Sequence, residues 1–312
     1  MRLNINKLHL LLHLNYGIKN SEAIFISKTF SQIDSFLDSE FLRLEGNISD
    51  KAFSALNEIS SQKNKYIDEM KNIEEKLTQE KIGIIHFHDD YYPENLRHIA
   101  HPPSLLFYRG NKECLKYTNM IAIIGTRKPS EEGMNLTKKL SAILSNNGFV
   151  IVSGLAKGID TIAHKSSIEN NGLTIAVIPG SISSSEVYPK ENRQLSEEII
   201  EKNGILISEL PPGSPPSKKN IVARNRIQAG LSRIIIPTDF KEGSGTIHAI
   251  NFGKKEDRLI FMPKSDKYKS VPSSYIENSD FTFDIKLDDI LDKISLHIYK
   301  NTFYNYDSKS LF

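Results

Sequence analysis

Arginine residues are concentrated in the stretch VARNRIQAGLSR, where Arg224, Asn225, Arg226 and Arg233 accompany apolar residues at helical spacing. Guanidinium groups are favoured where a planar cation must grip a phosphate or carboxylate through two hydrogen bonds. The simpler interpretation is that these arginines are solvated surface charges or partners of buried carboxylates. Taken alone, the stretch favours the simpler interpretation. A binding site for an anion would require further basic or glycine-rich segments elsewhere in the chain.

Two earlier segments combine glycine with basic residues, GTRKPSEEG at 125–133 and SGLAKGIDTIAHK at 153–165. In the first, Ser130 can cap a following helix, whose free N–H groups attract an anion. In the second, Gly154 and Gly158 bracket Lys157, a composition typical of phosphate-binding loops. Neither segment matches the spaced-glycine dinucleotide fingerprint or the P-loop, so an NAD enzyme is disfavoured.

Asp160 and His164 stand four positions apart and would share a helix face. Two ligands without a third give a weak metal signal, so no metal site is expected. A local Asp–His hydrogen bond is the favoured interpretation, because a buried polar group needs a partner. In the loop at 179–195, Tyr188 and Pro189 are expected to pack as a plug at the base of the loop.

Two later segments extend this chemistry. The proline-rich stretch from 211 to 217 runs into Lys218 and Lys219, and the stretch DFKEGSGTIHA carries Lys241. The same stretch offers four residues whose backbone N–H groups can form an anion nest: Gly243, Ser244, Gly245 and Thr246.

The elements that position these segments are six continuous apolar runs, at 120–125, 149–154, 173–180, 204–210, 233–240 and 258–263. Such runs are typical of parallel strands buried on both faces. Helical stretches lie between them, which predicts an α/β fold with a doubly wound, mostly parallel sheet. Ligands of such sheets bind outside the carboxyl ends of the strands, where every segment above lies. The sequence therefore predicts a basic rim and a polyanionic ligand.

The rest of the sequence indicates how the chain is divided into domains. Residues 1–80 have amphipathic helical spacing and predict a small helical module, followed by the α/β domain at 81–300 and a tail at 301–312. A last helix is expected at 287–298.

The composition indicates the class of protein. The single cysteine, Cys114, excludes an intrachain disulfide and fits a reducing cytoplasm. No apolar run approaches the ~20 residues of a membrane helix, so a cytoplasmic protein is expected. The net charge of +2 neither demands nor excludes nucleic acid.

The chain resembles the DprA/Smf family of DNA-processing proteins. GTRKPS, SGLAKGIDTIAH, YPKEN, ISELPPG and RNRIQAGLS occur in the family's order, and the resemblance runs from about residue 81 to about 298. It implies an extended Rossmann-like domain that binds and protects single-stranded DNA. It also implies loading of a RecA-type recombinase during transformation, a homodimer, no cofactor and no catalysis.

The resemblance carries specific residues with it. It implies that Arg127, Lys218, Arg224 and Arg226 hold the DNA. The full set of expected DNA-binding side chains is Arg127, Lys128, Lys157, Lys218, Lys219, Arg224, Asn225, Arg226 and Lys241. The expected phosphate-binding backbone is Gly125, Thr126, Ser130, Gly154, Gly158, Gly243, Ser244, Gly245 and Thr246.

The chain also departs from the family pattern. Ile221 stands where the family commonly has a phenylalanine, whose loss removes roughly 1–3 kcal/mol of stacking per base. The loop at 238–248 also differs. These departures leave open a specialised role in phage defence or mobile-element biology.

Two other functions remain open. The first is a nucleotide-binding or nucleotide-hydrolysing protein related to the lysine-decarboxylase-like phosphoribohydrolases, suggested by the GSGT turn. It needs a catalytic carboxylate, and the nearby candidates, Asp239 and Glu242, are expected to be solvated loop charges. The second is an interaction module whose basic face docks an acidic protein.

Overall fold

The computed structural model describes residues 2–14, 17–30, 36, 44, 46–264, 268, 270–284, 286–287 and 289–296. Its centre is a nine-stranded sheet in the order β1-β2-β6-β5-β4-β3-β7-β8-β9. The strands are β1 (Gly83–His86), β2 (Leu105–Gly110), β3 (Met120–Gly125), β4 (Val150–Ser153), β5 (Thr174–Val177), β6 (Ile205–Ser208), β7 (Ile234–Asp239), β8 (Leu259–Lys264) and β9 (Phe281–Asp284).

The α/β prediction is confirmed, since all six predicted strands form. β3 to β9 are mutually parallel, and the interior residues of β3 to β8 are almost fully buried, as their continuous apolar sequences require. β1 and β2 add an antiparallel edge beside β6. Neither of these two strands is among the six predicted from the sequence. The fold is Rossmann-like, with a mostly parallel sheet.

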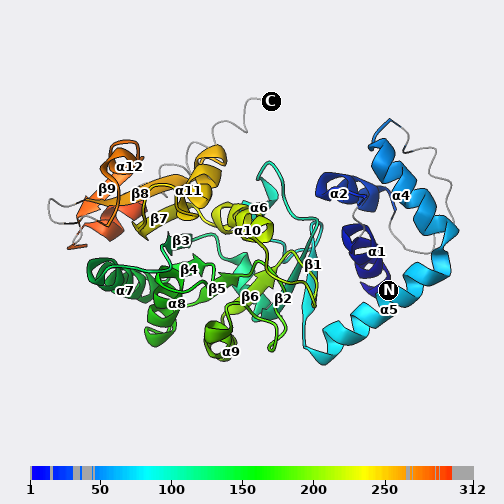
Figure 1. Ribbon diagram of the computed structural model, residues 1–312, viewed down its shortest axis with the longest axis horizontal. Helices are drawn as coiled ribbons and strands as arrows, with labels where there is room; N and C mark the ends of the chain where they lie inside the picture. Colours follow the sequence, from blue (N-terminus) through cyan, green and yellow to red (C-terminus); the bar gives the residue numbers. More distant parts are fainter. Residues whose placement is uncertain are drawn as a thin grey trace.

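Helices cover both faces of the sheet. The helices of this part are α6 (Glu94–Arg97), α7 (Glu131–Asn146), α8 (Ile159–Glu169), α9 (Arg193–Glu201), α10 (Lys218–Leu231), α11 (Thr246–Lys255) and α12 (Ser273–Glu277), with 3-10 turns η2 (Lys112–Lys116) and η3 (Lys190–Asn192). α7, α8 and α9 lie on one face, and α10 and α11 pack together on the other (Figure 1).

The strand order reverses next to β3. From β3 the chain adds β4, β5 and β6 in one direction, and then α10 carries it back so that β7 pairs with β3. The loops that follow β3 and β7 therefore lead to helices on opposite faces of the sheet, α7 and α11. This switch point is where open α/β sheets bind their ligands.

The N-terminal part is helical, as predicted. Its helices are α1 (Arg2–Leu14), α2 (Asn20–Thr29), α4 (Asp50–Ser61) and α5 (Lys63–Gln79). They share a core that includes Leu8, Leu12, Ile26, Leu56 and Ile59. α1 lies against β1 and β2, so this module packs on the antiparallel edge of the sheet (Figure 1). The domain boundaries at 80 and 300 stay predictions.

The last helix is shorter within the described range than predicted. Helix is described from 290 to 296, and Ile290 and Ile294 are fully buried. Residues 297–298 of the predicted helix, and the predicted tail at 301–312, lie outside the described residues. Among the helices that are described, none is both long enough and apolar enough to cross a membrane.

Candidate nucleic-acid interface

A groove of about 500 Å³ opens at the switch point, beside the carboxyl ends of β3 and β7. It is lined by Ile124, Gly125, Thr126, Arg127, Lys128, Ala156, Asp160, Ile221, Arg224, Asn225, Gln228, Lys241, Ser244, Gly245, Thr246 and Ala249. Four cations thus face one carboxylate. Of the eighteen predicted site residues, the structure brings ten into this groove.

The turn after β3 is held from both sides by backbone hydrogen bonds. Thr126 N donates to Asp239 O at 2.7 Å, and Thr126 O accepts from Ile159 N at 3.1 Å. A Cβ at Gly158 would stand only 2.4 Å from Thr126 O, and its φ of +81° also favours glycine. The turn therefore presents Arg127 and Lys128 as exposed side chains on a fixed backbone.

Arg224 forms the floor of the groove. It is buried, and its Nη1 donates to Val177 O, at the end of β5, at 2.6 Å. A Cβ on Gly154 would stand 1.7 Å from that Nη1, so only glycine admits the guanidinium here. Arg224 Nε has no hydrogen-bond partner among the described residues.

Asp160 and Arg224 influence one another inside the groove. Burial lowers the pKa of Arg224; Asp160 opposes that change, and Arg127 adds to it. Burial raises the pKa of Asp160, and Arg224 opposes that change. The expected Asp160–His164 hydrogen bond is wrong. Asp160 accepts from Ala156 N at 3.3 Å, while His164 Nδ1 lies 2.7 Å from Thr174 Oγ1, because α8 turns the histidine toward β5.

Arg226 points away from the groove. Its guanidinium donates to the Glu209 carboxylate, which also accepts from Asn20 Nδ2 at 2.7 Å. His13 Nε2 lies 2.6 Å from Glu209 O. Arg226 therefore belongs to a largely buried polar network between α10, β6 and the N-terminal helices. The structure does not bring it together with Arg224.

The N-terminus of α7 already holds an anion from the protein itself. Ser130 caps the helix as predicted, accepting from Gly133 N at 3.0 Å. Ser130 N and Oγ both donate to Asp239 Oδ2, at 2.8 and 2.9 Å. Asp239 was expected to be solvated, and this is wrong, because the carboxylate is buried as the partner of that helix end. Glu242 is exposed, as expected.

The other predicted residues flank the groove. Lys157 Nζ pairs with Glu191 Oε1 at 2.7 Å, and both side chains are about half exposed. Lys218 and Lys219 are exposed in the first turn of α10, which Ser217 caps. Gly243 has a φ of +75° and open space around it.

A second, smaller pocket adjoins the groove and shares Arg127, Ala156, Ile221 and Arg224 with it. Its other walls are Gly154, Lys157, Pro179, Tyr188 and Pro189. The prediction that Tyr188 and Pro189 both pack at the base of their loop is correct for only one of the two residues. Pro189 is buried, but Tyr188 is 43% exposed. No spacing in the sequence signals that the Tyr188 ring faces outward.

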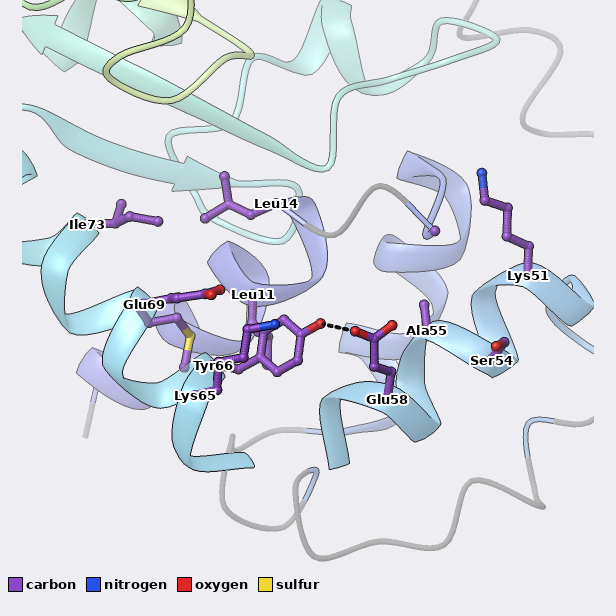
Figure 2. Close-up of a pocket in the computed structure, with 12 residues that line it drawn as sticks. Leu11, Leu14, Lys51, Ser54, Ala55, Glu58, Lys65, Tyr66, Glu69 and Ile73 are labelled. Atoms are coloured by element: carbon purple, nitrogen blue, oxygen red, sulfur yellow. Dashed lines mark hydrogen bonds between the residues drawn. The ribbon is translucent and has the colours of Figure 1, made fainter. Parts of the chain in front are cut away.

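The N-terminal module carries a separate pocket of about 730 Å³ between α1, α4 and α5. Figure 2 shows Tyr66 pointing at Glu58, whose Oε1 accepts from the phenol oxygen at 3.1 Å. Acidic and basic side chains both line it, including Lys51, Lys65 and Glu69. Such mixed lining gives no convergent site. Across the described part of the chain, no cluster of His, Cys, Asp or Glu can hold a metal ion.

Comparison with known proteins decides the family. The family model for DNA recombination-mediator protein A matches residues 83–292. The chain belongs to this family. The matched range covers every groove segment.

Individual relatives agree with this assignment. The DNA processing protein DprA of Streptococcus pneumoniae is 42% identical over 173 residues, which make up 55% of this chain. The chain spans 60% of the length of that relative. An X-ray structure of DprA from Streptococcus pneumoniae matches with a TM-score of 0.65 at 28% identity, covering 91% of this chain and 92% of that one.

A second solved structure concerns DNA. DNA processing protein A from Helicobacter pylori matches with a TM-score of 0.60 at 25% identity, covering 70% of this chain and 97% of that one. That structure concerns the single-stranded DNA binding mode of the Helicobacter pylori protein.

Proposed function

We propose that this protein binds single-stranded DNA in the groove at the switch point and loads a RecA-type recombinase on it. The carrying observation is that Arg127, Lys128, Arg224 and Lys241 line one groove against a single carboxylate, Asp160. This excess of positive charge, concentrated in a nearly neutral chain, favours a polyanion. The family and the DNA-binding relative support DNA as that polyanion.

The groove offers phosphates two kinds of contact. Arg127, Lys128 and Lys241 supply mobile charges, whereas the loop from Gly243 to Thr246 and the turn at Gly125 supply backbone N–H groups. Phosphate contacts of this kind carry no sequence information. Binding should therefore depend on salt and on strand length, with little preference for sequence.

The flanking lysines extend the path of the strand. Lys218 and Lys219 stand at the positive end of the α10 dipole, where a cation is unfavourable unless an anion lies nearby. Lys157 is held by Glu191 in an exposed ion pair, which is worth only about 0–1 kcal/mol and is easily exchanged for a phosphate. We propose all three as outer phosphate contacts. Arg226 stays a predicted DNA contact, although its ion pair with Glu209 favours a structural role.

The proposal includes a homodimer that acts in the cytoplasm with no resident cofactor and no catalysis. The single cysteine, Cys114, is buried, and burial raises its thiol pKa to about 11, which keeps the thiol unreactive. The nucleotide-hydrolase alternative is not favoured. One of its two candidate carboxylates, Asp239, is committed to Ser130.

The experiment is an anisotropy titration of a labelled poly-dT strand at several salt concentrations. With about three to seven phosphates neutralised, log K should fall with log salt at a slope of about −2 to −5. A longer strand should bind more tightly, and unlabelled duplex should compete poorly. Recombinase loading is then measured as faster filament assembly on a strand coated with single-strand-binding protein. Absence of binding at the lowest salt would contradict the proposal.

A further inference from the structure

The small pocket beside the groove contains an aromatic side chain with no internal function. Tyr188 is 43% exposed. Among the described residues, its ring stacks on no other aromatic side chain and its hydroxyl has no hydrogen-bond partner. Exposed aromatic rings that rest on a fixed backbone are typical anchors for a ligand.

The backbone around Tyr188 is clamped from three directions. Arg193 Nε donates to Val187 O at 3.1 Å. Asn192 Nδ2 donates to Leu155 O at 2.8 Å, which ties the loop to the end of β4. Glu186 Oε2 accepts from Gly213 N at 2.8 Å. The backbone that carries the ring is therefore fixed before any ligand arrives, so binding would cost little backbone ordering entropy.

The surroundings of the ring suit the face of a base followed by a phosphate. Pro179, Pro189 and Ile221 give the small pocket apolar walls, and Arg127 and Arg224 belong both to this pocket and to the basic groove. The enclosed space is only about 40 Å³, which is close to the volume of one water molecule in the liquid. A base would therefore lie across the mouth of the pocket and against the ring.

We propose that Tyr188 is a base-stacking residue, and that the small pocket is a nucleobase subsite for an unpaired base of the bound strand. The inference rests on the proposed function, since it places a base next to phosphates held in the groove. It supplies the aromatic face that Ile221 does not provide. It also gives a physical reason for selecting single strands, because the face of a base is free to stack only when its neighbours leave it exposed.

The first test uses the absence of tryptophan from this chain. In Tyr188→Trp, the introduced indole is the sole tryptophan, and stacking on a base should quench its fluorescence when poly-dT is added. A strand of abasic sites with the same phosphates should bind with little quenching. Equal quenching by both strands, or by neither, would overturn the subsite.

The second test compares affinities. Tyr188→Leu should weaken binding of poly-dT by about 5- to 150-fold, the range expected for one lost base stack, and Tyr188→Phe should restore it. Affinity for the abasic strand should change less than about twofold. Tyr117 is the matched control, since it is 44% exposed and precedes the amino end of β3, whereas the groove lies at the carboxyl ends of the strands. Tyr117→Leu should leave both affinities unchanged.

The outcomes separate the two proposals. If the wild-type protein binds no DNA, the proposed function fails first. If the wild-type protein binds and Tyr188→Leu binds poly-dT equally well, the groove stands and the nucleobase subsite is wrong.

Discussion

Arg224 and Arg226 are two positions apart on α10 and point their guanidinium groups to opposite sides of the helix. Arg224 reaches Val177 O at the groove, whereas Arg226 reaches the Glu209 carboxylate beneath the N-terminal helices. Residues two apart on an α-helix are rotated by about 200°, so one helix face cannot carry both. α10 thereby connects the groove with the N-terminal module.

The two arginines should therefore respond differently to substitution. Arg224→Lys should weaken binding of poly-dT about tenfold or more, because lysine cannot reproduce the planar donor set beside Gly154. Arg226→Met alone should destabilise the fold by up to about 3 kcal/mol, because it leaves Glu209 without its cation. The measurements are anisotropy titration and denaturant unfolding.

The control for this comparison is the double variant Arg226→Met/Glu209→Gln. It removes the unpaired charge and should recover much of the lost stability, with DNA affinity within about twofold of wild type. A large loss of DNA affinity in the folded double variant would make Arg226 a direct contact.

Glycine positions in the groove give a second prediction. Gly154→Ala places a Cβ where Arg224 Nη1 now lies, so the guanidinium must move. We expect a loss of about 1–3 kcal/mol in stability and a DNA affinity at least tenfold lower. Gly245→Ala meets open space, so the unfolding midpoint should stay unchanged. Any effect of Gly245→Ala on DNA affinity then reports a close approach of the strand to that loop.

The carboxylate at the start of α7 gives a third prediction. Asp239→Ala removes the acceptor of Ser130 N and Oγ and should cost about 1–3 kcal/mol of stability. The vacated helix end then attracts an external anion. Sulfate should raise the melting temperature of the variant more than that of the wild-type protein, relative to chloride at equal ionic strength. Equal sulfate effects on both proteins would argue against this assignment.

Acid stability gives a fourth prediction. Burial lowers the pKa of His9 to about 2 and that of His164 to about 3, from the ordinary value of 6.5. Below pH 6.5 the unfolded chain binds protons that the folded protein does not, so the stability present above that pH is lost as the pH falls. At pH 5 each histidine should cost about 2 kcal/mol.

His9→Phe tests the first of these groups. The ring of His9 stacks on that of His86 with centroids 4.0 Å apart, and both ring nitrogens lack a hydrogen-bond partner in the described structure. Phenylalanine preserves the stacking and removes two unsatisfied polar atoms. Urea unfolding should show a variant at least as stable at pH 7 and less sensitive to acid than wild type. Identical pH profiles would show that His9 titrates normally.

The sequence predicted the site best where the signal was local. The continuous apolar run before Gly125 and its counterparts marked the parallel strands, and the residues after them form most of the groove. The partners of Asp239 and Arg226 could not be predicted, because Ser130 and Glu209 come from other strand ends. The two-residue spacing of Arg224 and Arg226 on a helix was enough to predict that they point to opposite sides, but our interpretation of the sequence did not use this spacing. The exposure of Tyr188 depends on how its loop is clamped by distant backbone groups.

The most direct test of the central claim is charge reversal with a matched control. Arg127→Glu/Lys128→Glu reverses two charges in the groove, whereas Lys138→Glu/Lys139→Glu makes the same change in net charge at exposed positions of α7 outside it. Anisotropy titration of poly-dT at fixed salt should show binding abolished in the first variant and reduced less than about threefold in the second. Equal losses in both variants would mean that DNA responds to overall charge, and the groove would not be the binding site.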